Sequence, residues 1–335
     1  MSSEVLYRKY RPKKWSEVTG QAEIVRALSE AVRSKRLSHA YLFSGSRGTG
    51  KTTVARILAG EAGAAEEDIY EIDAASNRGI DDIRSLREHV SVLPFSSPFK
   101  VYIIDEVHML SKDAWNALLK TLEEPPRHVI FILATTELDK VPETIVSRCQ
   151  TFAFRRPSRE VIGELVGKVA RSEGYSLEAG AADLIALLGD GSFRDALGTL
   201  EKVIASSADK KLSLAEVEAI TGAPPAALVD SFLAALLSKD CDKSLNVIAE
   251  VGRSGLAVET FMTLVLEKAR LIMLREHSAS TRSDLVTRLS TRSDLVKLLS
   301  ILLSAAEATP RAAIKTLPLE MAVVEVCERA QSVVI

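Results

Sequence analysis

Residues 45–52 read Gly-Ser-Arg-Gly-Thr-Gly-Lys-Thr, the G-x-x-x-x-G-K-T pattern of a phosphate-binding loop. An apolar run at residues 40–43 precedes the loop and residues 53–59 favour a helix, which is the context that this motif needs. In such a loop, backbone N–H groups and the helix N-terminus hold phosphate oxygens. Lys51 can reach the β- and γ-phosphates, and the Thr52 hydroxyl can bind Mg²⁺. We therefore expect nucleotide contacts from Gly45, Ser46, Arg47, Gly48, Thr49, Gly50, Lys51, Thr52 and Thr53.

The second motif is residues 100–106, an apolar strand that ends in Asp105 and Glu106. In a doubly wound parallel sheet, the carboxyl end of this strand lies beside the phosphate-binding loop. Asp105 can then hold Mg²⁺, and Glu106 can polarise the attacking water as a general base. An acidic pair can also simply end a strand, but the loop upstream favours the catalytic interpretation.

Predicted strands alternate with predicted helices between residues 20 and 154, which is typical of a parallel α/β sheet. From residue 158 onward we find helical patterns and no convincing strand, and residues 222–225 read Gly-Ala-Pro-Pro, a boundary signal. We predict an α/β nucleotide-binding domain at residues 1–156, a small helical domain at 157–222 and an all-α domain at 223–335.

The composition is that of a soluble globular chain, because 47% of its 335 residues are hydrophobic and 26% are charged. The formal net charge of -2 provides no global field that attracts nucleic acid, so such contact needs a local patch. Cys149, Cys241 and Cys327 lie far apart and suggest neither a disulfide framework nor a zinc motif. This favours a reducing, cytoplasmic setting. We predict no signal peptide and no membrane span.

Residues 7–15 form a basic stretch interleaved with aromatic side chains. Taken alone, this stretch is best explained as a solvated basic arm. A nucleic-acid patch, a targeting signal and a segment packed on a nucleotide base are the competing interpretations.

Taken together, these motifs resemble the AAA+ ATPases, and among them the gamma/tau clamp-loader subunits of bacterial DNA polymerase III. The resemblance is specific over the first two predicted domains and weaker over the third. It implies an AAA+ P-loop domain, a small helical lid domain and an α-helical collar domain. The segments that carry it are residues 10–12 with Val18 and 20–21, then 45–52, 105–111, 118–126, 134–136, 147–149 and 191–197.

The resemblance assigns roles that the bare spacing leaves open. It implies that Thr136 is a sensor facing the γ-phosphate, although a threonine capping a strand explains this residue equally well. It implies that Arg148 is an arginine finger inserted into a neighbouring subunit's site, whereas the residue alone favours a surface ion pair. It implies that Arg194 reaches back from the lid to the nucleotide. The implied wall around the adenine consists of Tyr10, Arg11, Pro12 and Val18.

The family also implies contact with template phosphates, for which Arg78 and Lys120 are the candidates. A solvated lysine is the alternative for Lys120. Family members usually carry a four-cysteine zinc module before the segment at residues 72–76. Residues 58–69 contain no cysteine and are too few to house that module, so no zinc is expected. The chain also stops where the collar would stop, so we expect the tau-type extension to be absent.

As a whole, the resemblance implies an ATPase that uses ATP and Mg²⁺ within the DNA polymerase III holoenzyme. Its implied partners are other clamp-loader subunits in a hetero-pentamer-like ring, a sliding clamp and primed template DNA. Alternatives are another AAA+ DNA motor such as a branch-migration helicase, a replication factor C-like small subunit, and a non-hydrolysing scaffold. The intact residues Lys51, Thr52, Asp105 and Glu106 argue against the scaffold.

Overall fold

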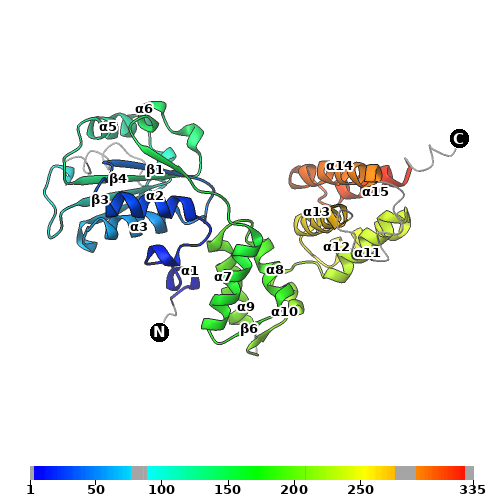
Figure 1. Ribbon diagram of the computed structural model, residues 1–335. Coiled ribbons are helices and arrows are strands. Elements are labelled where there is room, and N and C mark those ends of the chain that lie inside the picture. The colour runs from blue at the N-terminus through cyan, green and yellow to red at the C-terminus, as the bar shows by residue number, and fades with distance from the viewer. Residues whose placement is uncertain (1–3, 77–85, 87–88, 208, 276–291, 329–335) are drawn as a thin grey trace. The chain divides into compact units, whose positions relative to one another are not determined.

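The computed structural model describes residues 4–76, 86, 89–207, 209–275 and 292–328. The chain divides into two compact units, Met1–Ala205 and Ser206–Ile335. Figure 1 shows the five-stranded sheet and its helices in the first unit and the bundle of helices α11 to α15 in the second. The division into three domains, at residues 156 and 222, stays a prediction.

The first unit is built on a parallel sheet with the strand order β2-β3-β4-β1-β5. Its inner strands β1, β3 and β4 are buried almost throughout because helices cover both faces, which explains their unbroken apolar sequences. The predicted parallel α/β sheet is therefore confirmed. The strands are β1 (Ala40–Ser44), β2 (Ile69–Asp73), β3 (Lys100–Asp105), β4 (Val129–Thr135) and β5 (Gln150–Ala153).

Two layers of helices sandwich this sheet (Figure 1). Leu58 packs with one layer and Leu118 with the other, and both are fully buried. The layers are α2 (Ala22–Arg33) with α3 (Lys51–Glu61), and α5 (Lys112–Glu123) with α6 (Glu143–Val146). Ser111 begins α5 by accepting a hydrogen bond from the Ala114 N–H, as its position before the apolar repeat predicts. The short elements are α1 (Leu6–Lys9), η1 (Trp15–Glu17), η2 (Glu66–Asp68), η3 (Val107–Met109) and η4 (Leu138–Lys140).

Helices complete the first unit after the sheet. They are α7 (Arg159–Ser172), α8 (Ala179–Leu188) and α9 (Phe193–Ser206), with the two-residue strand β6 (Ser176–Leu177) before α8. Val166 and Leu200 are fully buried, which indicates a small core of their own. We predicted no convincing strand beyond residue 158, and this was wrong at β6 and again at residues 211–212. A two-residue strand carries no periodicity that could reveal it.

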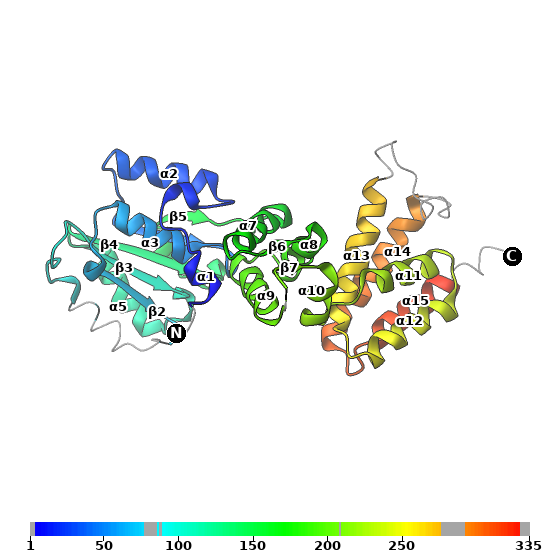
Figure 2. The same cartoon turned by 90° about the horizontal axis from the view of Figure 1, so that it is seen from below.

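The second unit is helical apart from β7 (Lys211–Leu212). Its helices are α10 (Leu214–Thr221), α11 (Ala226–Leu237), α12 (Cys241–Arg253), α13 (Val258–Arg275), α14 (Arg292–Ala308) and α15 (Leu317–Glu328), with η6 at Thr309–Arg311. Helices α11 to α15 form one bundle (Figure 2) and share one core. Phe232 and Phe261 meet edge to face within that core. Among the described residues no single helix is long and apolar enough to cross a membrane, although α10 and α11, bent by 86°, meet those criteria as a pair.

A buried carboxylate ties the loop before β3 to the end of η2. Asp68 is fully buried and accepts hydrogen bonds from the Phe95 N–H at 2.6 Å, the Ser96 N–H at 3.1 Å and the Ser97 hydroxyl at 2.7 Å. Burial alone would raise the pKa of Asp68, but these donors outweigh it and hold the pKa below its usual value. The ionised carboxylate therefore stabilises the folded loop.

We expect Asp68→Ala to lower the free energy of unfolding by about 1–3 kcal/mol, because three donors lose their acceptor. Urea unfolding at pH 7 measures this loss, and Glu67→Ala, an exposed neighbour, is the matched control. A carboxyl with a depressed folded pKa stabilises above its unfolded pKa of about 4, and this contribution disappears as pH falls through the folded value. The gap between wild type and Asp68→Ala should therefore close in acid. A gap that persists below pH ~2 would contradict this account.

Candidate nucleotide-binding site

The phosphate-binding loop has a backbone that only glycine suits at its key positions. Gly45, Gly48 and Gly50 have φ values of 143°, 73° and 99°. A Cβ on Gly45 would lie 2.4 Å from the Phe154 carbonyl oxygen, and one on Gly48 would lie 1.9 Å from the Ser192 hydroxyl oxygen. The loop is thus packed between β5 and the start of α9, and the Phe193 N–H donates to the Gly48 carbonyl at 3.0 Å.

Lys51 begins α3 and is folded back into the loop. Its Nζ donates to the carbonyl oxygens of Gly45 at 2.7 Å and Ser46 at 3.0 Å. Burial lowers the pKa of Lys51, while the carboxylates of Glu106 and Asp105 act in the opposite direction. The buried Ser46 hydroxyl has no hydrogen-bond partner in the described part of the chain. A cation and an unpaired hydroxyl inside a ring of glycines fit a phosphate group.

The end of β3 meets the start of α3 at a possible metal site. The Thr52 hydroxyl donates to Asp105 Oδ2 at 2.7 Å, and the Glu106 N–H donates to Asp105 Oδ1 at 2.9 Å. These are the hard oxygen ligands that Mg²⁺ prefers, and Mg²⁺ takes its remaining ligands from water and substrate phosphates. The described residues contain no group of three or more His, Cys, Asp or Glu that could hold a metal by itself. Thr52 and Asp105 therefore fit a Mg²⁺ that arrives with a nucleotide.

The Glu106 carboxylate is held by the end of β4. The Thr136 N–H and hydroxyl donate to Glu106 Oε2 at 3.2 Å and 2.8 Å. His108 Nδ1 lies 3.4 Å from the same oxygen, and His108 Nε2 lies 3.3 Å from Glu137 Oε1. Glu106 itself has φ 49° and ψ 43°, a left-handed backbone that is uncommon for glutamate and clusters at functional sites. This arrangement orients a carboxylate at the mouth of the loop.

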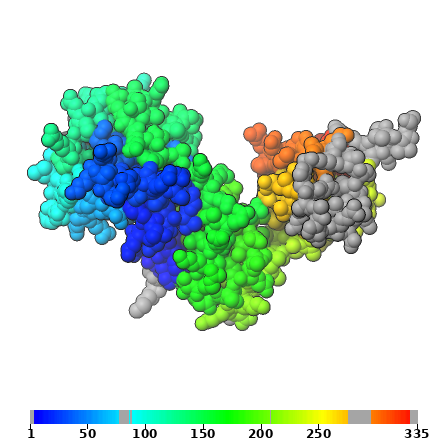
Figure 3. Space-filling view, in the orientation of Figure 1, coloured from blue at the N-terminus to red at the C-terminus, as the bar shows by residue number. Residues whose placement is uncertain are grey.

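A cavity of about 800 Å³ opens beside these groups. Figure 3 shows the N-terminal residues, in dark blue, packed against the green helical region, and residues of the N-terminal segment, α7 and α9 all line the cavity. Lys9 Nζ donates to Glu173 at 2.7 Å, and the Tyr10 hydroxyl donates to the same carboxylate. The cavity has the size and the mixed apolar and charged lining of a small-ligand site.

Comparison with known proteins shows which proteins this chain resembles in sequence. A family model described as "DNA polymerase III, delta subunit" matches residues 20–78 and 62–158. The tau subunit of DNA polymerase III from Bacillus subtilis is 43% identical over 276 residues, which cover 76% of this chain and 49% of that protein. Over about three quarters of its length or more, the chain is thus similar to gamma/tau subunits of DNA polymerase III. The gamma/tau subunit from Mycobacterium tuberculosis is 37% identical and covers 81% of this chain, and the tau subunit from Escherichia coli is 37% identical and covers 85%.

The chain spans about half the length of the curated relatives it matches. Among solved structures, the Thermotoga maritima RuvB Holliday junction branch migration motor matches with a TM-score of 0.54 at 20% identity. The match covers 78% of this chain and 91% of the RuvB chain. At that identity it supports the AAA+ fold and carries nothing about activity.

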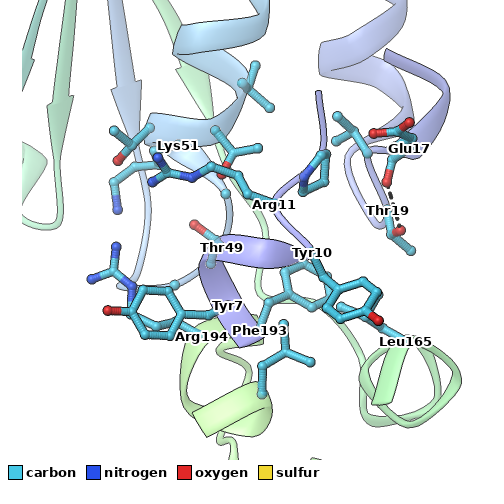
Figure 4. Close-up of a pocket in the computed structure, with 18 of the residues that line it drawn as sticks. Tyr7, Tyr10, Arg11, Glu17, Thr19, Thr49, Lys51, Leu165, Phe193 and Arg194 are labelled. Atoms are coloured by element: carbon cyan, nitrogen blue, oxygen red, sulfur yellow. Dashed lines mark hydrogen bonds between the residues drawn. The ribbon is translucent and has the colours of Figure 1, made fainter. Parts of the chain in front are cut away.

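The fold brings most of the predicted site residues to one cavity (Figure 4). Those lining it are Tyr10, Arg11, Pro12, Val18, Arg47, Gly48, Thr49, Gly50, Lys51, Thr52, Thr53, Asp105, Glu106 and Arg194. Gly45 and Ser46 belong to the loop but do not line the cavity. Arg194 reaches it as predicted for a residue of the helical region, and its guanidinium lies 5.8 Å from the centre of the Tyr7 ring.

Three further predicted residues that the structure describes lie elsewhere, and a fourth, Arg78, is not described. Thr136 contacts Glu106 and does not line the cavity. Arg148 follows α6, where its guanidinium donates to Glu123 at 2.8 Å and to the Thr144 carbonyl at 2.7 Å. Lys120 is exposed on α5, and Arg78 lies outside the described residues. The surface ion pair that the bare sequence favoured for Arg148 is therefore present, and it leaves the residue on the outside of its own unit.

The sequence did not single out several lining residues. They include Tyr7, Asp73, Leu165, Lys168, Val169, Phe193 and Leu197. Leu165 and Val169 lie in the region where helical patterns were predicted, but such a pattern could not tell that these residues border a cavity. His108 carried a signal, because it stands two residues after Glu106, but no role was assigned to it.

Proposed function

We propose that this chain is an ATP-dependent clamp-loader subunit that binds and hydrolyses ATP to load a sliding clamp onto primed DNA. One observation carries the proposal: Lys51, the Thr52–Asp105 pair and Glu106 converge on one cavity in a chain similar to gamma/tau subunits. This combination of a phosphate cradle, metal ligands and a positioned carboxylate serves phosphoryl transfer to water.

The chain's own residues divide the work of hydrolysis. The loop and Lys51 hold the phosphates, and Thr52 and Asp105 hold the metal. A bound Mg²⁺ supplies charge neutralisation at the phosphate oxygens. Glu106 orients the attacking water and accepts its proton, and Thr136 keeps the carboxylate at the mouth of the loop through two hydrogen bonds. Catalysis then rests on positioning and electrostatics.

The position of Arg148 implies that the proposed hydrolysis requires assembly with a neighbouring subunit. Its guanidinium pairs with Glu123 and does not line its own cavity, so it contributes to hydrolysis only by entering the site of a neighbouring subunit. We propose related clamp-loader subunits, the sliding clamp and primed template DNA as partners. A cytoplasmic location accords with this role. Contact of Lys120, and of Arg78, with template phosphates belongs to the same proposal.

The second candidate is another AAA+ DNA motor such as a branch-migration helicase, because the phosphate-binding loop and the acidic strand end do not by themselves identify the DNA substrate. The two functions differ in the DNA that stimulates turnover. The test measures ATP hydrolysis by the chain assembled with its clamp-loader partners, on primed DNA with the clamp and on a four-way junction of equal length.

We expect stimulation by primed DNA with the clamp and none by the junction. The Lys51→Ala variant, which removes the phosphate-binding cation, should abolish turnover on every substrate. Stimulation by the junction alone would favour the branch-migration function. Turnover that survives Lys51→Ala unchanged would overturn hydrolysis at this site.

A further inference from the structure

Arg11 reaches toward the phosphate-binding loop rather than toward the base end of the cavity. It follows α1 and lies in the N-terminal segment, next to Tyr10. Figure 4 shows the two side chains diverging: Tyr10 lies beside Leu165 on α7, whereas Arg11 extends toward Lys51. Neighbours in the sequence thus serve opposite ends of one cavity.

The charged groups that act on Arg11 indicate which end of the cavity its guanidinium occupies. Burial lowers the pKa of Arg11, and so do the nearby cations Arg56 and Arg194, while Glu71 and Asp105 raise it. Asp105 accepts the hydrogen bond from Thr52 at the metal site. Arg56, on the helix that follows the loop, forms an ion pair with Glu71 on β2. Asp105 and Arg56 thus place the Arg11 guanidinium near the metal site and the helix α3 that begins at the loop.

The Arg11 guanidinium also has no acceptor among the residues that the structure describes. It is half-buried, and it makes no hydrogen bond and no ion pair with any residue that the structure describes. A guanidinium has five N–H donors and remains charged, so half-burying it without an acceptor costs free energy. Lys51 differs, because two loop carbonyls accept its protons. An unpaired planar cation that lines a cavity beside a phosphate cradle fits an oxyanion.

We infer that Arg11 is a phosphate-binding residue, which contacts the polyphosphate of a nucleoside di- or triphosphate from the N-terminal segment. This inference rests on the proposed nucleotide site and changes the role that the family resemblance implied, a place in the adenine wall. A polyphosphate would supply the missing acceptor and would also screen the repulsion among Arg11, Arg56 and Arg194.

The inference gives the N-terminal segment a second task. The same segment binds α7 through Lys9 and Tyr10, which share the Glu173 carboxylate. Phosphates bound at Arg11 would therefore fix the segment that contacts the helices carrying Arg194. Arg11 is then a positioning residue for the lid as well as a ligand of the phosphates.

The test compares the binding of ATP, ADP and adenosine to the full chain by competition against a fluorescent nucleotide. We expect Arg11→Gln to weaken the binding of ATP and ADP by about 10–100-fold, because charge-assisted hydrogen bonds to the phosphates are lost. The affinity for adenosine, which has no phosphate, should not change. Arg11→Lys should recover part of the loss, because it keeps the charge but not the fork of donors. Lys14→Gln, an exposed cation of the same segment, is the control. Thermal unfolding of each variant shows whether the fold is intact.

The outcomes separate the inference from the proposed function. If Arg11→Gln weakens the binding of all three ligands equally, or of none, the phosphate role of Arg11 is overturned while the nucleotide site stands. A wild-type chain that binds neither ATP nor ADP removes the nucleotide site and this inference with it. The salt dependence gives a second readout: ATP binding by Arg11→Gln should fall less steeply with salt than binding by the wild type.

Discussion

Replacing Glu106 with glutamine is expected to lower ATP turnover of the assembled complex by about 10²–10⁴-fold, the usual contribution of a general base. Glutamine keeps the shape and still accepts the two hydrogen bonds from Thr136, so the loop and the Thr52–Asp105 pair should stay in place. ATP affinity should therefore change little. Single-turnover hydrolysis and equilibrium ATP binding, measured on the same preparation, separate the two effects.

The matched control for this prediction is Glu124→Gln, an exposed glutamate at the end of α5. It makes the same charge change on the same unit away from the cavity, and its turnover should match the wild type. If Glu106→Gln loses ATP binding and turnover in equal proportion, the carboxylate serves to hold the nucleotide or the loop rather than to activate water.

The sequence was sufficient where function depends on local backbone geometry. Gly48 and Gly50 need left-handed φ values that other residues seldom adopt, so the spacing of the glycines alone predicted the loop. The apolar strand that ends in Asp105 predicted the second part of the site, the metal-binding end of β3, because the ends of parallel strands meet at one edge of a sheet. The loop and this strand end do meet, because the Thr52 hydroxyl donates a hydrogen bond to Asp105 Oδ2 at 2.7 Å.

The sequence was not sufficient where a side chain could point in more than one direction. Spacing placed Thr136 at the end of a strand, but only the structure shows that its hydroxyl contacts Glu106. The Tyr-Arg-Pro segment was assigned to one wall, yet Tyr10 and Arg11 diverge toward opposite ends of the cavity. Asp68 is a similar case, because the three donors that it binds come 27 to 29 residues later in the chain. Such contacts depend on tertiary packing, which no local pattern encodes.

Replacing Arg148 with alanine is expected to lower turnover of the assembled complex by about 10³–10⁵-fold, the contribution of an arginine finger. The isolated chain should show no such loss, because the guanidinium does not line its own cavity. Its present partner is Glu123, and the two side chains are 35% and 45% exposed, so their ion pair is weak and can be exchanged. ATP affinity should be kept, which distinguishes Arg148 from Lys51 and Arg11. Arg127→Ala, an exposed arginine after α5, is the control.

Mixing two inactive variants tests whether Arg148 acts between subunits. Arg148→Ala keeps an intact loop, and Lys51→Ala keeps an intact arginine, so each lacks what the other retains. In a mixed assembly, an Arg148→Ala chain beside a Lys51→Ala chain has a complete site, and turnover should recover in part. If the finger acted within its own chain, every site in the mixture would lack one group and no recovery would occur. Full turnover by a lone wild-type chain would equally contradict action in trans, because a single chain has no neighbour to supply the guanidinium.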